Sequence, residues 1–445
     1  MKHTVRLIGT LMALSAPLCA LAESHANETT SADASTSKNA DFTEDFSCSE
    51  VIYPLAPSAG KGIKPATNAE AKVNAALMAR KLPYLHLIGK DNKFYVGIGG
   101  AVKGVASVDF GHVLHNANEF IVSAIPMTQE KGDGALYQVS AQQTELYLIA
   151  GFNPGTKYEV AAYVNGRFLG NNYGFQLENA HISFMGFTAG YGYGLFCDTW
   201  AAPTTIDYEG PNAMLAVTNG ILDYRHSFGR WTVGAGIEMP MASFTTNGYV
   251  RKVNQRIPDV PFMVKYSLPG GGHLGASVIL RGLQYRDLLK DKNRTVCGWG
   301  VRLSGAGTLF GPVGYCFQGA YGKGMNSYIQ DISGMGLDLT PESSDGKMKA
   351  VKGYGLMGGL SCNISRTVSA NASYSHVRVY PGEYSGAEES WESQYSYGQY
   401  AVANVMWQIT PIVQCGLESV YGRRVNMNGQ QAHDNRLQTM LQVSF

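Results

Sequence analysis

The chain has no surplus of charge of either sign and few charged residues of any kind. Lys and Arg number 35 against 34 Asp and Glu in 445 residues, and charged residues make up 16% of the sequence. Binding to nucleic acid through its phosphates needs a clustered basic surplus. The composition therefore predicts no nucleic-acid partner.

Long apolar runs are missing too, apart from one at the N-terminus. Residues 1–22 combine Lys2 and Arg6 with an apolar stretch from Leu7 to Leu18 and an A-x-A motif at 20–22, the pattern of a cleaved signal peptide. No uncharged apolar run of about 18 residues follows, so no transmembrane helix is predicted. An exported chain of this kind is periplasmic, secreted or an outer-membrane barrel.

Cysteine is sparse, and no two cysteines form a C-x-x-C pair, which excludes zinc-ribbon and thioredoxin-like sites. The six cysteines beyond the signal peptide are scattered through strand-like segments. They either form up to three disulfides in an oxidising compartment or fill small apolar gaps in the wall. These residues are Cys48, Cys197, Cys297, Cys316, Cys362 and Cys415.

Motifs of the common catalytic sites are absent as well. No G-x-S-x-G, H-E-x-x-H, P-loop or spaced G-x-G-x-x-G occurs. His112 and His115 fall in a Gly- and Asn-rich loop and predict no metal site. We expect a protein that is not an enzyme and that carries no cofactor and no metal.

Glycine and tyrosine are abundant instead, with 53 Gly and 26 Tyr, whereas Gly makes up about 7% of an ordinary chain. Sixteen strand-like segments follow one another from Phe94 to Phe445. Short turns follow the even-numbered segments, among them Gly305-Ala306-Gly307. Long loops follow odd-numbered ones, the largest near 111–137, 198–216, 241–259, 323–349 and 381–396. Short turns at one rim and long loops at the other are typical of transmembrane barrels. We therefore predict an all-β fold, a membrane-spanning antiparallel up-and-down β-barrel of about 16 strands.

The barrel is predicted to occupy residues 94–445, after the signal peptide and a periplasmic segment at 23–93. That segment begins with a Ser/Thr/Ala-rich, mostly disordered leader and contains one helix over 69–81. Two interpretations of the helix remain open. It either packs on a surface, or it serves as an oligomerising segment or a plug of the barrel.

The last segment carries the most specific local signal. Its apolar residues alternate with polar ones and end on an aromatic, with Leu441, Val443 and Phe445 on one face. Outer-membrane barrels commonly end in such a strand, and it resembles the signature that the barrel-assembly machinery reads. We assign these three residues to an assembly signal.

Several segments resemble the DcaP-like trimeric outer-membrane porins. Phe94 to Phe110 is similar to the family's first strand, and Glu119-Phe120 followed by Ser123 to Pro126 is similar to the next loop. Gly194 to Trp200 resembles the strand that enters the long pore loop, and Ile237-Glu238-x-Pro240 resembles the end of the next hairpin. The resemblance implies a sixteen-stranded trimeric channel for small, often anionic solutes. One departure is the family's N-terminal coiled coil, which is reduced here to about one short helix.

Charges on the polar face of the strands would set the selectivity of a lumen. Alternation places six basic residues inward: Lys103, Arg225, Lys265, Arg281, Arg294 and Arg302. Four of these fall on consecutive strands and would form one basic wall. Segment 198–216, with Asp198, Asp207 and Glu209, is the candidate constriction loop. An acidic loop opposite a basic wall would create a transverse field across the pore.

The sequence thus predicts a porin in the outer membrane of a Gram-negative bacterium. Its partners would be the membrane lipid, two further copies in a homotrimer, the barrel-assembly machinery and small hydrophilic solutes, often anionic ones. The alternative is a closed structural or surface-display barrel without channel activity. Planar-bilayer conductance separates the two.

Overall fold

The computed structural model describes residues 85–89, 93–342, 344–382 and 393–445. The predicted signal peptide, most of the periplasmic segment, the helix at 69–81 and Cys48 lie outside these ranges. No helix in the described part of the chain is long and apolar enough to cross a membrane.

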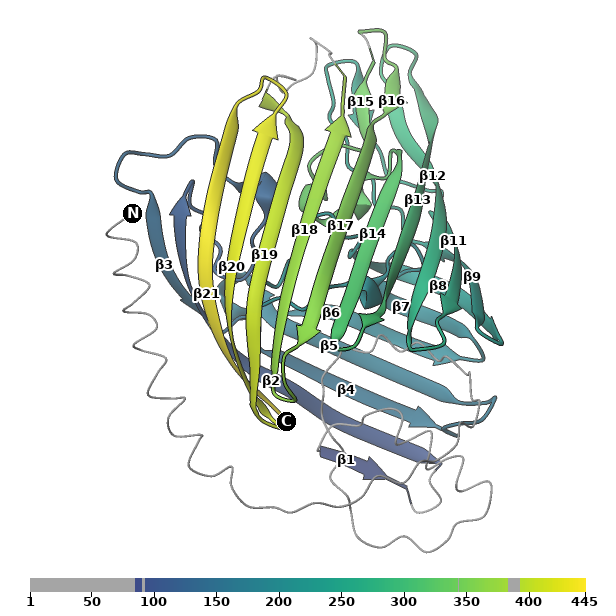
Figure 1. Ribbon diagram of the computed structural model, residues 1–445. Coiled ribbons are helices and arrows are strands. Elements are labelled where there is room, and N and C mark those ends of the chain that lie inside the picture. Colours follow the sequence, from purple (N-terminus) through teal and green to yellow (C-terminus); the bar gives the residue numbers. More distant parts are fainter. Residues whose placement is uncertain (1–84, 90–92, 343, 383–392) are drawn as a thin grey trace, which may run out of the picture. The chain divides into compact units, whose positions relative to one another are not determined.

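The described strands form one closed antiparallel barrel of 16 strands (Figure 1). Each barrel strand pairs with the next along the chain. The last strand then pairs with the first, from Ala101↔Ser444 to Gly111↔Asp434. Two barrel strands are each made of two pieces, because β3 and β4 both pair with β2, and β10 and β11 both pair with β12. This confirms the predicted fold class and strand count.

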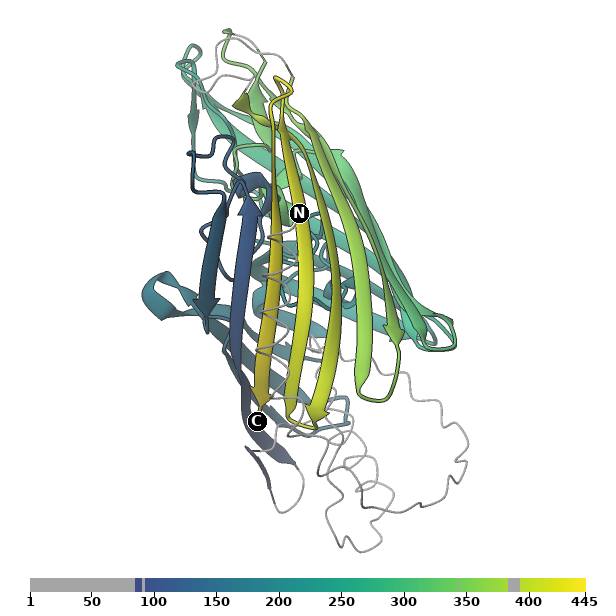
Figure 2. The same ribbon diagram turned by 60° about the vertical axis from the view of Figure 1, so that its left-hand side comes forward.

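Most of the barrel's strands lie within a few residues of the predicted strand-like segments, and Figure 2 shows the same barrel turned by 60°. The barrel elements are β2 (Phe94–Gly111), β3 (Ala135–Ser140), β4 (Glu145–Phe152), β5 (Val160–Gly170), β6 (Gly174–Phe184), β7 (Phe187–Tyr193), β8 (Thr218–Phe228), β9 (Trp231–Glu238), β10 (Val250–Lys252), β11 (Val260–Ser267), β12 (Gly272–Asp287), β13 (Lys292–Phe310), β14 (Val313–Lys323), β17 (Lys352–Asn363), β18 (Val368–Tyr380), β19 (Tyr395–Thr410), β20 (Val413–Asn426) and β21 (Gln431–Ser444). The smaller elements are β1 (Leu85–Ile88), β15 (Leu339–Pro341), β16 (Met348–Ala350) and the 3-10 turns η2 (Val122–Ala124), η3 (Asn171–Tyr173), η4 (Thr199–Ala201), η5 (Asn326–Tyr328) and η6 (Gln330–Ile332).

Two features of the wall differ from the sequence expectation. Strand β1 lies in the segment predicted to be periplasmic. It pairs with residues 95–98 of β2, whereas β21 closes the barrel on residues 101–111 of the same strand. The turn between β13 and β14 is Gly311-Pro312 rather than 305–307. Gly305 belongs to the strand, because a Cβ there would come within 2.8 Å of His273 O and of the Leu274 side chain.

Short turns and long loops occupy opposite rims, as predicted. The turn between β6 and β7 has only Met185 and Gly186, both at positive φ (50° and 85°), the geometry of the tight hairpins that match strand twist. The long connections are 112–134, 194–217, 239–259, 324–351 and 381–394. We call these the short-turn rim and the long-loop rim.

The outer face of the barrel is a belt of exposed apolar side chains. Val102, Leu280, Leu303, Leu356 and Leu417 are between 41% and 62% exposed, and each alternates with an inward neighbour. A water-soluble sheet would not leave such a continuous band uncovered. An outward apolar band is what a barrel presents to lipid.

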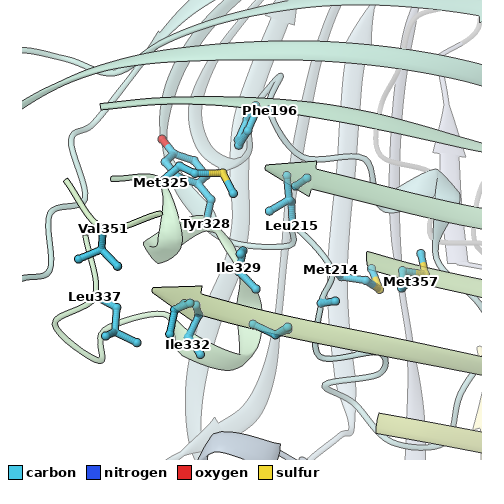
Figure 3. Packing of buried hydrophobic residues seen from close by; sticks show 14 of the residues in the cluster. Phe196, Met214, Leu215, Met325, Tyr328, Ile329, Ile332, Leu337, Val351 and Met357 are labelled. Atoms are coloured by element: carbon cyan, nitrogen blue, oxygen red, sulfur yellow. The ribbon is translucent and has the colours of Figure 1, made fainter. Parts of the chain in front are cut away.

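The largest hydrophobic cluster lies inside the barrel rather than in its wall. Loops contribute Phe196, Leu215, Met325, Tyr328 and Ile329, each at most 2% exposed. Figure 3 shows these side chains gathered against strands of the wall. Long loops therefore fold inward and fill part of the lumen.

Candidate functional site in the barrel interior

Three inward loops, 112–134, 194–217 and 324–351, bind one another inside the barrel. Asn212 of the second loop accepts a hydrogen bond from Val122 N at 2.7 Å and donates to Phe120 O at 2.9 Å. Asp331 of the third accepts one from Ser123 N at 2.7 Å. Because each loop contacts the other two, they form one interior layer, which we call the loop plug.

The wall also holds the loop plug. Tyr395 of β19 donates its hydroxyl to Asp331 at 2.7 Å, and Tyr400 of the same strand donates to Asp207 at 2.8 Å. Asp207 also accepts a hydrogen bond from Phe120 N at 2.9 Å. These buried polar groups are satisfied by specific partners, which fixes the loops in one arrangement.

Glu418 of β20 binds the backbone of the predicted constriction loop. Its carboxylate accepts hydrogen bonds from Ile206 N at 2.7 Å and Asp207 N at 2.8 Å, and the Asn404 side chain donates to it at 2.8 Å. Burial and the neighbouring Glu418 charge raise the pKa of the Asp207 carboxyl. The middle of 198–216 is thus anchored to the β19–β20 side of the wall.

The start of the same loop is anchored to another part of the wall, β12 and β13, where the predicted basic residues lie. Asp198 lies 2.8 Å from His273 Nε2 and 3.0 Å from the Arg302 guanidinium, and the Ser304 hydroxyl donates to it. Burial alone would raise the pKa of Asp198, but these donors hold it below its ordinary range. Asp198 therefore contacts the basic wall directly instead of facing it across the pore.

Arg281 points inward but does not face water. It is 3% exposed and pairs with Asp259 at 2.9 Å and Asp338 at 3.2 Å, and it donates to Gly324 O at 2.6 Å. Strand alternation predicts that the Arg281 and Arg302 guanidiniums face water in the lumen, and this prediction is wrong. Both are covered by inward loops whose carboxylates and carbonyls replace water.

The predicted basic wall is largely compensated by acids. Arg294 pairs with Asp287 at 2.8 Å near the long-loop rim, so Arg281, Arg294 and Arg302 all have carboxylate partners. Lys265, the fourth residue of the predicted basic wall, lies on β11. A single positive wall of four open cations is thus absent.

A cavity lies inside the short-turn end of the barrel. Its polar lining includes His181, Thr188, Arg225, Thr232, Lys265 and Arg302. The loop residues Leu195 to Trp200 form its inner end, where Arg302 is joined to Asp198. The Arg225 side chain is 22% exposed and lies 3.7 Å from Asp223. Arg225 and Lys265 are the other predicted basic residues that line this cavity.

Of the remaining predicted residues, the charged ones lie inside the barrel and those of the assembly signal lie outside it. Lys103 of β2 donates to Ile206 O at 3.1 Å and so contacts the constriction loop from the first strand. Glu209 is half-buried, and Gln330 of the third loop donates to its carbonyl at 2.7 Å. Leu441, Val443 and Phe445 all face outward, at 44%, 39% and 36% exposure.

Sequence reasoning missed the third loop as part of the interior. Tyr328 is buried, and its hydroxyl lies 2.8 Å from Glu238 and 3.0 Å from Asp259. A signal was present in the sequence, because Met325, Ile329, Ile332 and Leu337 are too apolar for a solvated surface loop. The cysteines of the described segments, Cys197, Cys297, Cys316, Cys362 and Cys415, are free thiols.

No protein-family model and no curated protein sequence matches this chain. Among solved structures, the outer membrane channel DcaP of Acinetobacter baumannii is similar at a TM-score of 0.67 and 18% identity, over 81% of this chain and 100% of that one. The chain has the DcaP fold. This confirms the fold that the sequence motifs implied.

Two other porins are more distant in structure. An anion-selective porin from Comamonas acidovorans has a TM-score of 0.47 and 12% identity, over 79% of this chain and 100% of that one. Salmonella typhi OmpF in complex with daunomycin has a TM-score of 0.48 and 10% identity, over 81% and 100% of the two chains.

Proposed function

We propose that this chain is a porin, a passive diffusion channel in the outer membrane of a Gram-negative bacterium. The observation that carries the proposal is a closed barrel of 16 strands whose outer face is apolar and whose interior holds a cavity lined in part by His181, Arg225 and Lys265. Barrels of this size enclose an aqueous lumen, whereas barrels of about 8 strands are filled by their own side chains.

The loop plug narrows this lumen, so the channel would pass small hydrophilic solutes. Arg225 and Lys265 lie along the open cavity, and the nearest acid of the constriction loop, Asp198, is already neutralised by Arg302 and His273. The positive charges of Arg225 and Lys265 along the cavity would then favour small anions over cations. Like the trimeric porins that its motifs resemble, the chain would form a homotrimer and would reach the membrane through the barrel-assembly machinery.

A closed structural barrel is the second candidate. It is favoured by the apolar core that the inward loops form inside the lumen. A barrel whose interior is sealed by this core would display its loops and conduct nothing.

Planar-bilayer recording separates the two candidates. Purified, heat-modifiable protein should give stable open steps, and its reversal potential in a KCl gradient should lie on the anion side. Silence from correctly folded protein would instead support the closed barrel. A cation-side reversal potential would leave the channel in place and remove the proposed anion preference.

A further inference from the structure

A cluster of cations and aromatic rings lies on the outside of the barrel, on β17 to β20. We call Lys352, Arg378, Arg423, Tyr380 and Tyr397 the outer cationic patch. Strand register brings them together, because Tyr380 pairs with Lys352, Arg378 with Tyr397, and Arg423 with Gln399 in the next row. Alternation points all of them away from the lumen, opposite to the inward Val377, Val379 and Tyr400.

The cations of this patch rest on aromatic rings instead of on acids. Lys352 Nζ lies 4.7 Å from the centre of the Tyr380 ring. The Arg378 guanidinium lies 5.2 Å from the rings of both Tyr380 and Tyr397, and that of Arg423 lies 5.9 Å from Tyr397. Arg423 also donates to the side chains of Gln399 and Gln431.

No carboxylate in the described part of the chain pairs with Lys352, Arg378 or Arg423. The interior arginines provide a contrast, since Arg281, Arg302 and Arg436 each have an acid within 3.2 Å. The patch therefore keeps its positive charge while its hydrogen-bond donors are held in place by ring contacts.

The position of the patch on the strands is specific. Arg378 is two residues from the end of β18 and Arg423 is three from the end of β20, both at the long-loop rim. Tyr374 and Tyr421 lie on the same outward faces, further from the long-loop rim, and are 47% and 39% exposed. The apolar belt with Leu417 follows them. Cations, aromatic rings and aliphatic side chains thus follow one another from rim to mid-wall.

This order matches a lipid that carries phosphate on its headgroup. Interfacial tyrosines mark the boundary between headgroups and acyl chains, and cations just beyond that boundary attract anionic headgroups. Arginine is suited to phosphate because its planar fork binds two oxygens at once.

We propose that the outer cationic patch binds the phosphate groups of a phosphorylated glycolipid in the outward leaflet of the membrane. The proposal rests on the proposed function only for its orientation, since it requires the long-loop rim to face the cell exterior. A bound lipid of this kind would seal the wall over β17 to β20 and hold the loop-side half of these strands rigid.

The test measures lipid binding to folded, detergent-solubilised protein by native mass spectrometry. The probes are bis-phosphorylated lipid A, its dephosphorylated form and inorganic phosphate. Wild type should retain bis-phosphorylated lipid A, and millimolar phosphate should not displace it, because the acyl chains contribute to the binding. The double variant R378Q/R423Q should bind it about tenfold more weakly or worse.

Two further variants test whether lipid binding depends on the charges of this patch or on positive charge anywhere on the protein. R378K/R423K keeps both charges but removes the planar forks, so its affinity should lie between those of wild type and R378Q/R423Q. K157Q/R230Q removes two exposed cations at the short-turn rim and should bind as wild type does. Should the Gln variant fail to fold, the Lys variant and the dephosphorylated lipid still decide the matter.

Several results would overturn the proposal. These are equal affinity in wild type and R378Q/R423Q, equal binding of the two lipid A forms, or displacement by free phosphate alone. Dissociation of the oligomer by R378Q/R423Q would identify the patch as a contact between subunits instead. Bilayer conductance is recorded on the same samples, so loss of lipid binding with intact conductance separates this proposal from the porin assignment.

Discussion

The Arg436 guanidinium and the Asp109 carboxylate form a two-pronged ion pair across the seam where β21 closes on β2. Nε lies 2.6 Å from Oδ1 and Nη2 lies 2.8 Å from Oδ2, and both side chains are fully buried. Arg436 also donates to Asn116 O at 2.7 Å and lies over the Phe120 ring. One residue thus connects the last strand, the first strand and the first inward loop.

Replacing one member of this pair should destabilise the barrel strongly. R436Q leaves a buried carboxylate without its cation, and such losses cost about 3–5 kcal/mol. The temperature at which the folded band disappears in semi-native electrophoresis should fall. R286Q is the matched control, because its partner Asp291 is 85% exposed and exposed pairs contribute about 0–1 kcal/mol. Equal shifts in both variants would contradict the role given to the seam pair.

Neutralising basic residues should affect selectivity only where they reach the open cavity. R225Q/K265Q should lower anion preference at 0.1 M salt and have little effect at 1 M, where the Debye length falls from about 10 Å to about 3 Å. R281Q should leave the reversal potential unchanged and should increase current noise, because Arg281 holds Gly324 at the start of the third loop. K290Q/K292Q, at an exposed hairpin, is the control for net charge. The assignment fails if R281Q shifts the reversal potential more than R225Q/K265Q does.

The loop plug should be held more firmly at mildly acidic pH. Burial raises the pKa of Asp207 and of Asp331 above their unfolded values, so the folded loops bind protons more readily than the unfolded chain. The stability that these protons contribute is fully present below the unfolded pKa of about 4 and is lost as pH rises through the folded pKa. Loop-dependent current fluctuations should therefore increase from about pH 4 to neutral pH.

The variant D207N tests whether protonation of Asp207 causes this pH dependence of the current fluctuations. Its side chain stays uncharged at all pH values, so the rise in fluctuations should be smaller than in wild type. D291N changes an exposed acid at a hairpin and should leave the pH profile as it is. A wild-type profile in D207N would show that Asp207 does not hold the plug.

Removing Phe445 should reduce the amount of inserted barrel and leave the channel's properties unchanged. Phe445 exchanges both backbone hydrogen bonds with Gly100, at 2.9 Å and 3.1 Å, and its ring packs over that glycine, but it faces away from the lumen. Heat-modifiable protein in membranes measures insertion, and single-channel conductance measures the pore. Phe445→Tyr should restore most of the insertion. Normal insertion of the truncated chain would contradict the assembly role.

Epitope tags should distinguish the two rims on intact cells. Tags inserted at 345–346 or 428–429, in connections of the long-loop rim, should be reached by antibody. Tags at 154–155 or 270–271, in connections of the short-turn rim, should be reached only after permeabilisation. The reverse pattern would invert the orientation and place the outer cationic patch on the wrong side.

Strand periodicity predicted which face of the wall a residue lies on. It did not predict which loop residues contact that residue inside the barrel. Arg281 and Arg302 both face inward, because alternate residues of a strand share a face. Whether they meet water depends on Asp338 and Asp198, which reach them from loops distant in sequence. Such pairings follow from tertiary packing alone.

Turn positions show a similar limit. Glycine is common in turns, so the sequence predicts a turn at Gly305 and Gly307, whereas both lie within β13, and at Gly305 the neighbouring atoms leave no room for a Cβ. The turn of the same hairpin, Gly311-Pro312, lies at the end of a longer strand. The glycines therefore predicted that a hairpin is present but not where its turn lies.

The pairing of β21 with β2 joins residues separated by more than 300 positions in the chain. Until the last strand arrives, every partly folded sheet has two open edges whose backbone groups lack partners, and open edges recruit other chains. Joining ends so far apart also makes closure entropically slow. The finished barrel leaves no open edge between β2 and β21, whereas every partly folded sheet exposes both edges until residue 444 has paired.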